Sequence, residues 1–246
     1  MDRQNDREYL KDTGLNLSDK VLNKRRFNKK ILELHKREFM LGQALNYIHK
    51  DQHTIDVGAS TGTYAWAFAE RAEHVHCFEA VPFVHDTRLR WVADQFDNIT
   101  TYPYAVCDRE GTATFWVDDK KLGNNSFTNI VNGQPIEVKT VALDSFGFER
   151  VGFLKIDTEG HELDVLRGAS STIERNRPTC MIEIYPMFNN GPVDATFQWM
   201  WDTDQYRCYY NHRGQGLVEV ESVDHGVEVA HGDINIHDGD FLFVAR

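Results

Sequence analysis

The chain has few of the features that would assign a protein class at once. Its four cysteines lie far apart and form no CxxC pair, so we expect neither a disulfide framework nor a thiolate zinc site. No apolar run approaches the ~18 residues that a membrane-spanning helix needs, so we expect no membrane span. The first residues, MDRQNDREYL, lack the apolar core of a secretory signal. Together these absences predict a cytoplasmic protein.

Positive charge is scarce outside the first fifty residues. Residues 1–50 carry 12 Lys or Arg and 7 Asp or Glu, whereas the remainder carries 15 and 31. The acidic remainder argues against a nucleic-acid duplex as the main partner. The basic stretch from Lys20 to Arg37 could contact an anionic partner or form a solvated helix face. Several carboxylates could gather a hard divalent cation, but no spacing demands one, so we expect no metal.

The length of 246 residues suits one large α/β domain with a small appendage. Residues 1–17 are polar and aperiodic, which predicts a loose arm. From Phe27 to Ile48, apolar residues recur at spacings of three and four, which predicts a long amphipathic helix or a broken pair of helices. We therefore divide the chain into an N-terminal arm with a helical extension, residues 1–50, and a Rossmann-like domain, residues 51–246.

Short apolar runs alternate with helical patterns beyond His53. The runs cover residues 54–57, 75–78, 99–104, 153–156 and 179–184. The helical patterns cover residues 64–72, 84–96 and 161–173. Such alternation is typical of βαβ units, so it predicts a parallel sheet with helices on both faces.

Two stretches depart from this alternation. Residues 107–150 contain two runs, 112–117 and 136–143, on either side of a polar loop, which predicts an inserted antiparallel β-hairpin. Residues 206–246 hold Gly-rich turns and end in FLFV after a turn, which favours a late hairpin at one edge of the sheet.

The segment Thr54–Thr63, TIDVGASTGT, predicts a cofactor-binding turn between a strand and a helix. Gly58 and Gly62 would let the backbone approach a ligand. A dinucleotide site needs GxGxxG, which is absent, and Asp56 would repel a pyrophosphate. S-adenosylmethionine carries an ammonium and a sulfonium and no phosphate, so a carboxylate favours it. The alternative is that Asp56 only caps the following helix.

Glu79 ends the second apolar run, about 20 residues past the glycines. An acid at that position suits a pair of ribose hydroxyls. Both cofactor types contain a ribose, so Glu79 supports a nucleoside cofactor without choosing between them.

Five segments in order resemble the motifs of the FkbM family of methyltransferases. They are TIDVGASTGTYAWAFA, VHCFEAVP, TVALDSF, FLKIDTEGHELDVLRGA and MIEIYP, from about Thr54 to Pro186. The resemblance implies the class I methyltransferase fold, a mostly parallel sheet of seven strands whose last strand is antiparallel. It also implies methylation of a hydroxyl, often on a sugar or a glycosylated metabolite. Two positions depart from the family pattern, because Ser60 and Tyr104 stand where Asn is usual.

The glycine turn, the acids at the strand ends and the resemblance to the FkbM family together predict the cofactor contacts. We expect S-adenosylmethionine to contact Asp56, Gly58, Ala59, Ser60, Thr61, Gly62, Glu79, Ala80, Ala105 and Asp157.

Methyl transfer to a hydroxyl benefits from a base, because an alcohol is a poor nucleophile until its proton begins to leave. The exit of the 153–156 strand supplies candidates in Asp157, Glu159 and His161, and Glu183 ends the next strand. We predict catalytic roles for these four residues. The alternative for the acids is a favourable position at a helix N-terminus, and for Glu183 a buried pair with Lys155.

The polar loop 118–134 is rich in amides and hydroxyls, which suit sugar hydroxyls. We predict acceptor contacts from Asn124, Asn125, Ser126 and Lys155. The chain is thus expected to be an O-methyltransferase acting on a sugar or glycosylated small molecule, with homo-oligomerisation left open. The competing interpretations are an NAD-dependent oxidoreductase and a non-catalytic module that binds S-adenosylmethionine.

Overall fold

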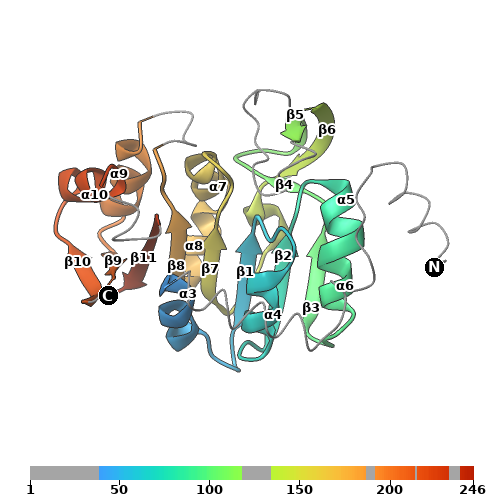
Figure 1. Cartoon of the computed structure of the whole chain (residues 1–246), viewed down its shortest axis with the longest axis horizontal. Coiled ribbons are helices and arrows are strands. Elements are labelled where there is room, and N and C mark those ends of the chain that lie inside the picture. Colours follow the sequence, from blue (N-terminus) through green and yellow to red (C-terminus); the bar gives the residue numbers. More distant parts are fainter. Residues whose placement is uncertain (1–38, 118–133, 187–191, 214, 233–238) are drawn as a thin grey trace. The chain divides into compact units, whose positions relative to one another are not determined.

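The described part of the chain is built around a large β-sheet. The computed structural model describes residues 39–117, 134–186, 192–213, 215–232 and 239–246. Within them, eight strands pair in the order β10-β9-β11-β8-β7-β1-β2-β3 (Figure 1). In chain order these are β1 (His53–Val57), β2 (His74–Phe78), β3 (Ile99–Tyr102), β7 (Val151–Ile156), β8 (Thr179–Glu183), β9 (Tyr206–His212), β10 (Gly216–Val220) and β11 (Asp240–Ala245).

Five neighbouring strands, from β3 to β8, pair in parallel. Every residue of β1 except His53 is buried, as expected for a strand that is covered on both faces. β1 has β2 on one side and β7 on the other, so the strand order reverses there. Open α/β sheets bind ligands beyond the carboxyl ends of their strands at such a switch point. The parallel sheet predicted from the strand–helix alternation is confirmed.

The other three strands reverse direction one after another. β11 lies between β8 and β9 and is antiparallel to both, so the predicted antiparallel last strand is confirmed. Without β10, the sheet has the strand order of the class I methyltransferase fold. β10 pairs with β9 as a hairpin at the edge of the sheet, so the late hairpin predicted there is confirmed, although it brings the sheet to eight strands rather than the predicted seven. Only Val220 of β10 is buried, so this strand has a weak core pattern in the sequence.

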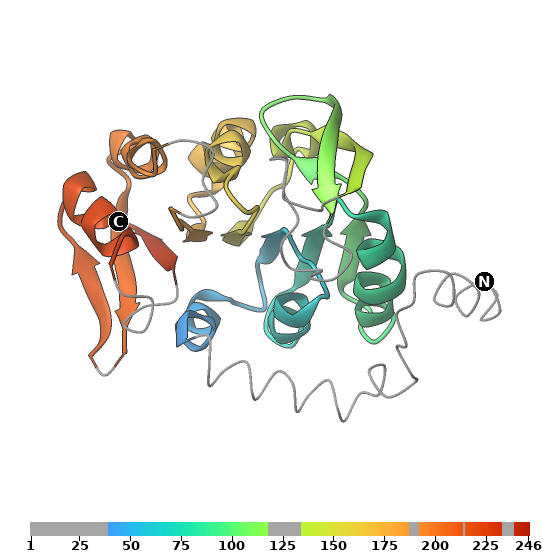
Figure 2. The ribbon, with the colours of Figure 1, turned by 45° about the horizontal axis from the view of Figure 1, so that its top comes forward.

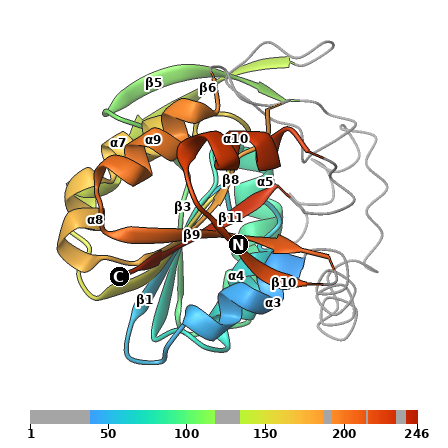
Figure 3. The same ribbon diagram turned by 90° about the vertical axis from the view of Figure 1, so that its left-hand side faces the viewer.

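Helices cover both faces of the sheet, as predicted. Figures 2 and 3 show α3, α4 and α6 on one face and α7, α8 and α9 on the other. The helical elements are α3 (Phe39–Ala44), η1 (Leu45–Tyr47), α4 (Thr63–Ala69), α5 (Pro82–Val84), η2 (His85–Leu89), α6 (Arg90–Ala93), η3 (Leu143–Phe146), α7 (Glu162–Gly168), α8 (Ser170–Asn176), α9 (Asp194–Asp202) and α10 (Val223–Ala230).

Two of the predicted helices are less regular than their sequence pattern suggests. The helix expected over 84–96 is a run of α5, a π-helical segment η2, and α6. The helix expected over 161–173 breaks between α7 and α8. Close to that break, Gly168 packs so tightly against the carbonyl of Cys107 that a side chain there would overlap it. Apolar periodicity does not encode such contacts, so the break is not visible in the sequence.

A second, smaller sheet contains the predicted hairpin. β5 (Gly111–Val117) and β6 (Gln134–Val141) are antiparallel, and the short strand β4 (Ala105–Val106) pairs in parallel with β6. The hairpin is thus confirmed, and β4 extends it to three strands. Phe115 and Val138 pack against Val81 and Val84, which follow β2. The small sheet therefore lies at the carboxyl end of the main sheet (Figure 1).

The short helix α3 packs against β9 and β11. Its residues Met40, Leu41 and Ala44 are fully buried, which fits the predicted apolar stripe. The earlier part of that stripe lies outside the described residues. Among the helices that the structure describes, none is long and apolar enough to cross a membrane.

Candidate active site

The turn after β1 is locked between the two strands beside it. The backbone N–H groups of Gly58 and Ala59 donate to the carbonyl of Phe78, at 3.0 and 2.9 Å. Gly58 has a φ of +76°, and its missing Cβ leaves room for the carbonyl oxygen of Asp157. Glycine is thus required here by the protein's own backbone, in addition to any ligand.

The second glycine of the motif begins α4. Gly62 has a φ of +78° and is the N-cap of the helix. A Cβ on Gly62 would lie 3.0 Å from the side chain of Val92, which belongs to α6. Ser60 also takes a left-handed conformation, with a φ of 48°. Thr61 Oγ1 lies 3.1 Å from Thr63 Oγ1 within the same turn.

Glu79 joins the turn after β1 to the turn after β2. Its Oε2 accepts a hydrogen bond from the N–H of Ser60 at 2.9 Å, and its Oε1 accepts one from the N–H of Val81 at 2.8 Å. The side chain is buried, and burial raises the pKa of Glu79 to about 7 despite these two bonds. Glu79 therefore ties the two turns together through its two carboxylate oxygens. Ala80 lies between Glu79 and Val81, and Ala105 is buried in β4 beside this connection.

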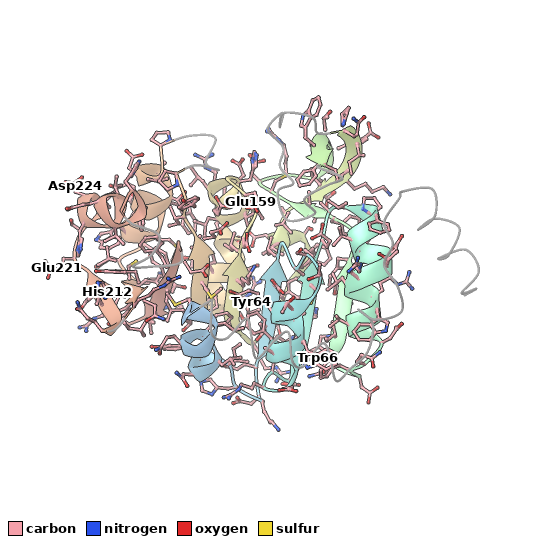
Figure 4. The ribbon with its side chains drawn as sticks, viewed as in Figure 1. Tyr64, Trp66, Glu159, His212, Glu221 and Asp224 are labelled. Atoms are coloured by element: carbon pink, nitrogen blue, oxygen red, sulfur yellow. The ribbon has the colours of Figure 1, made fainter. Side chains whose placement is uncertain are left out.

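A buried lysine lies between two of the predicted site acids. Lys155 Nζ donates to Asp157 Oδ2 at 2.9 Å and lies 3.6 Å from Asp56 Oδ1. It also lies 4.8 Å from the centre of the Tyr64 ring. Tyr64 is labelled in Figure 4 and belongs to α4. Burial would lower the pKa of Lys155, but Asp157 and Asp56 outweigh burial and raise it above its usual value. Lys155 is only 2% exposed, so its contacts are with the protein.

Asp56 is fully buried and forms an ion pair with Lys155, whose Nζ lies 3.6 Å from its Oδ1. Burial raises its pKa to about 6, with Lys155 opposing that shift. Neither of its carboxylate oxygens has a hydrogen-bond partner in the structure. A buried acceptor without a donor is costly, so the site suits a ligand that brings a donor or a positive charge. The ammonium-bearing end of S-adenosylmethionine fits that requirement.

Three carboxylates meet at the carboxyl ends of β7 and β8. One oxygen each of Asp157, Glu159 and Glu183 can be chosen so that all three lie within 4.8 Å of one another. Burial, and then the charges of Asp157 and Glu162, raise the pKa of Glu159 to about 8. Burial raises the pKa of Glu183 well above its usual range, and Asp157 beside it adds to the shift. A hard cation could also bridge such a group, which the sequence allowed but no spacing demanded.

His161 and Asp144 each contact a residue of the helices that follow β7. His161 Nδ1 lies 3.3 Å from Asp164 Oδ2 on α7, and burial lowers the pKa of His161. Asp144 accepts hydrogen bonds from the N–H groups of Ser171 and Thr172 at the start of α8, at 2.9 and 2.8 Å. These bonds outweigh burial and lower the pKa of Asp144. Asp144 therefore caps a helix.

The sequence did not single out one neighbour of the site and one pocket. Tyr64 lies within the segment TIDVGASTGTYAWAFA, but an aromatic residue is ordinary near a helix N-terminus. The pocket has a volume of about 390 Å³, and none of its lining residues was predicted as a site residue. They are Pro186, Pro192, Val193, Asp194, Asp224, Val227 and His231. Asn124, Asn125 and Ser126 lie outside the described residues.

Comparisons with known proteins agree with this architecture. A model of the methyltransferase FkbM domain matches residues 56–211. A hexuronic acid methyltransferase, AglP of Haloferax volcanii, is 25% identical over 151 residues, which are 59% of this chain and 61% of that protein. The chain thus matches about three fifths of that relative.

Two solved structures are also similar. Methyltransferase FkbM of Methylobacillus flagellatus has a TM-score of 0.49 and 16% identity, with 80% of this chain and 44% of that chain covered. A putative methyltransferase of Streptococcus mutans, solved in complex with SAH, has a TM-score of 0.47 and 10% identity, with 84% and 95% covered.

The family match begins at Asp56 and extends into β9, so it spans the turn after β1, Glu79 and the acidic cluster. It covers more than half of the chain, and it does not support the competing NAD-dependent oxidoreductase. The protein therefore belongs to the FkbM family of methyltransferases, with S-adenosylmethionine as its cofactor.

Proposed function

We propose that this protein transfers a methyl group from S-adenosylmethionine to a hydroxyl of a sugar or of a glycosylated small molecule. The observation that carries the proposal is the acidic cluster of Asp157, Glu159 and Glu183. Lys155 precedes Asp157 by two residues and forms an ion pair with Asp56, so the cluster lies close to the turn after β1. A cofactor-binding region and a set of candidate bases thus share the carboxyl end of the sheet. A hydroxyl acceptor needs a base there, whereas an acceptor that is already a nucleophile does not.

The cofactor would be held by residues of β1, β2 and their turns. Asp56 offers two buried acceptor oxygens, and Glu79 has remaining acceptor capacity for ribose hydroxyls. Gly58 and Gly62 let the turn pack closely against the carbonyl of Asp157 and the side chain of Val92, which fixes its path beside the proposed cofactor site. When bound, the cofactor supplies an electrophilic methyl group on a sulfonium. The chain's role is then to align the acceptor and to remove its proton.

We assign the base to the acidic cluster rather than to His161. Asp157, Glu159 and Glu183 lie together, whereas His161 contacts Asp164 on its own helix. Glu159 has its pKa raised to about 8, which makes it a stronger proton acceptor than an ordinary carboxylate when it is ionised. Asp157 receives a hydrogen bond from Lys155, which fixes the direction of its carboxylate. Glu183 is the third member of the cluster, and its carboxylate is suited to orient the acceptor.

The choice of a sugar acceptor is supported by the family and by one relative. AglP is described as a hexuronic acid methyltransferase, and the matched regions are distantly related. The residues that we propose for acceptor contacts, Asn124, Asn125 and Ser126, carry amide and hydroxyl groups that suit sugar hydroxyls. We propose no nucleic-acid acceptor, because the chain is acidic overall.

The proposal is tested by binding and transfer assays on the full chain. Calorimetric titration with S-adenosylhomocysteine should give a binding signal, and titration with NADH should give none. Transfer of a labelled methyl group would then be measured on neutral sugars, uronic acids and glycosides, with and without EDTA. Ether formation on a hydroxyl supports the proposal. A methyl ester on a uronic acid contradicts it, and binding of S-adenosylhomocysteine without transfer to any acceptor favours the non-catalytic module.

A further inference from the structure

The loop between β7 and α7 has an unusual backbone path. It runs from Asp157, where β7 ends, to Glu162, where α7 begins. Glu159 has a φ of 54° and Gly160 a φ of 100°, so two successive residues lie in the left-handed region. This conformation costs a non-glycine residue of order 1–3 kcal/mol and persists only where surrounding contacts impose it. Some contact must therefore hold Glu159 in place.

The carboxylate of Glu162 supplies that contact. Its Oε1 accepts three hydrogen bonds of 3.0 Å, from the N–H of Thr158, the Oγ1 of Thr158 and the N–H of Gly160. The donors flank Glu159 on both sides. Glu162 is 2% exposed, so water does not offer these groups an equivalent acceptor. All three bonds end on the same oxygen, so Glu162 fixes the backbone on both sides of Glu159.

The other end of the loop is fixed separately. The N–H of Asp157 donates to the carbonyl of Val57 at 3.1 Å, which continues the pairing of β1 with β7. Gly58 leaves space for the carbonyl of Asp157. Asp157 is therefore held by the sheet, whereas Glu159 depends on the loop. The sheet thus sets the separation of Asp157 from Glu183, whereas the loop's shape sets the distance of the Glu159 carboxylate from both.

We propose that Glu162 is a positioning residue, which brings Glu159 against Asp157 and Glu183 by holding the loop in its left-handed turn. The expected effect on turnover rests on the proposed function. The expected effect of Glu162 on the backbone of Glu159 does not. A first-turn acid that only interacts with the helix dipole would contribute through its charge. Glu162 contributes through one acceptor oxygen, which a glutamine also carries.

The difference between glutamine and alanine tests the proposal. Glu162→Gln keeps a carbonyl oxygen for the three donors, so kcat should stay within about threefold of the parent. Glu162→Ala removes the acceptor, and misplacement of a catalytic group by about 1 Å can cost ~10²-fold, so kcat should fall about 10- to 100-fold. Affinity for S-adenosylhomocysteine should change less than about threefold in both. Glu174→Ala, an exposed helical change, is the control.

Several outcomes would overturn the inference. Equal loss of kcat in the Gln and Ala variants would mean that the charge of Glu162 matters and its acceptor geometry does not. Full activity in Glu162→Ala would mean that the loop holds itself. Should Glu162→Ala fail to fold, Gly160→Ala strains the same loop at φ 100° and should lower kcat with cofactor affinity retained. Unchanged kcat in a folded Gly160→Ala variant would also contradict the inference.

Crystal structures of the two Glu162 variants separate this inference from the proposed function. In the Ala variant, Glu159 should leave its left-handed conformation, and in the Gln variant it should keep it. That readout needs no acceptor, so it remains valid if the protein methylates something other than a hydroxyl. An unchanged loop in the Ala variant would overturn the inference while leaving the methyltransferase assays to decide the activity.

Discussion

Gly58 and Asp157 belong to different motifs of the sequence, and their backbones are in direct contact. The carbonyl oxygen of Asp157 occupies the place where a side chain at residue 58 would begin. The hydrogen bond from Asp157 N–H to Val57 makes the contact part of the β1–β7 pairing. The cofactor turn and the loop with the acidic cluster are therefore one rigid unit, and damage at either residue should reach the other.

Gly58→Ala should destabilise the protein strongly. The new Cβ meets the Asp157 carbonyl and the residue keeps a positive φ, so we expect a loss of about 2–5 kcal/mol in the free energy of unfolding. Gly147→Ala is a matched control, because Gly147 has a φ of +61° and no atom within 4 Å of the added Cβ. It should lose only about 1–2 kcal/mol. Urea unfolding measures both, and equal losses would contradict the contact's importance.

Asp56→Asn should weaken cofactor binding. A hydrogen bond to a charged group is worth roughly 1.5–3 kcal/mol, so the affinity for S-adenosylhomocysteine should fall at least about tenfold by calorimetry. Asp144→Asn is the control, because Asp144 caps α8 and should affect stability without affecting affinity. Unchanged affinity in a folded Asp56→Asn variant would leave Asp56 with a structural role only.

Glu79→Gln should damage the site more than an isosteric change usually does. The two oxygens of Glu79 each accept a backbone N–H, from Ser60 and from Val81. A glutamine has one oxygen, so its amide nitrogen would face one of these donors. Affinity for S-adenosylhomocysteine should fall in Glu79→Gln and further in Glu79→Ala. A cofactor complex in which Glu79 points away from the ribose would refute the assignment.

The pH dependence of turnover should identify the base within the acidic cluster. A base must be ionised, so activity falls as the pH drops through its pKa. With the pKa of Glu159 raised to about 8, the acid limb of kcat should lie near that value if Glu159 is the base. Glu159→Gln should then abolish that limb together with most turnover. If the limb persists in Glu159→Gln, Asp157→Asn should be the variant that loses turnover while retaining cofactor affinity.

Stability at low pH should depend on His76. Burial first, and then His74 and His53, lower the pKa of His76 from 6.5 to about 3. The unfolded chain therefore binds a proton below pH 6.5 that the folded protein refuses, so the free energy of unfolding falls as the pH drops from 6.5 towards 3. His76→Gln should flatten this slope in urea titrations, whereas a change at the exposed His231 should not. An unchanged slope in His76→Gln would contradict the prediction.

The sequence predicts the sheet because buried parallel strands produce short continuous apolar runs. It predicts that Asp56, Glu79 and Asp157 approach one another because each lies at or next to the carboxyl end of a parallel strand, and these ends meet at one edge of the sheet. Neither argument requires knowledge of a side chain's neighbours, so the sequence alone was enough to predict the cofactor turn and the acidic cluster.

The remainder depends on contacts between residues distant in sequence. The sequence placed Lys155 on the same strand face as Asp157 and offered Glu183 as a buried partner, whereas the structure pairs Lys155 with Asp157 and Asp56. Glu162 looks like an ordinary first-turn acid until its three donors are seen. The edge hairpin was predicted, but β10 was not counted as an eighth strand because an edge strand buries little, and the break at Gly168 was missed because a close backbone contact leaves no periodic signal.

The position of β11 determines the order in which the sheet can assemble. The β9–β10 hairpin forms between residues close in sequence, and such hairpins form within microseconds. Its connection to the parallel strands passes through β11, which pairs with β8 across nearly sixty residues of chain. Closing a loop of that length is entropically costly before any contact rewards it. We therefore expect the β9–β10 hairpin to form early. It joins the parallel strands only when β11 pairs with both β8 and β9.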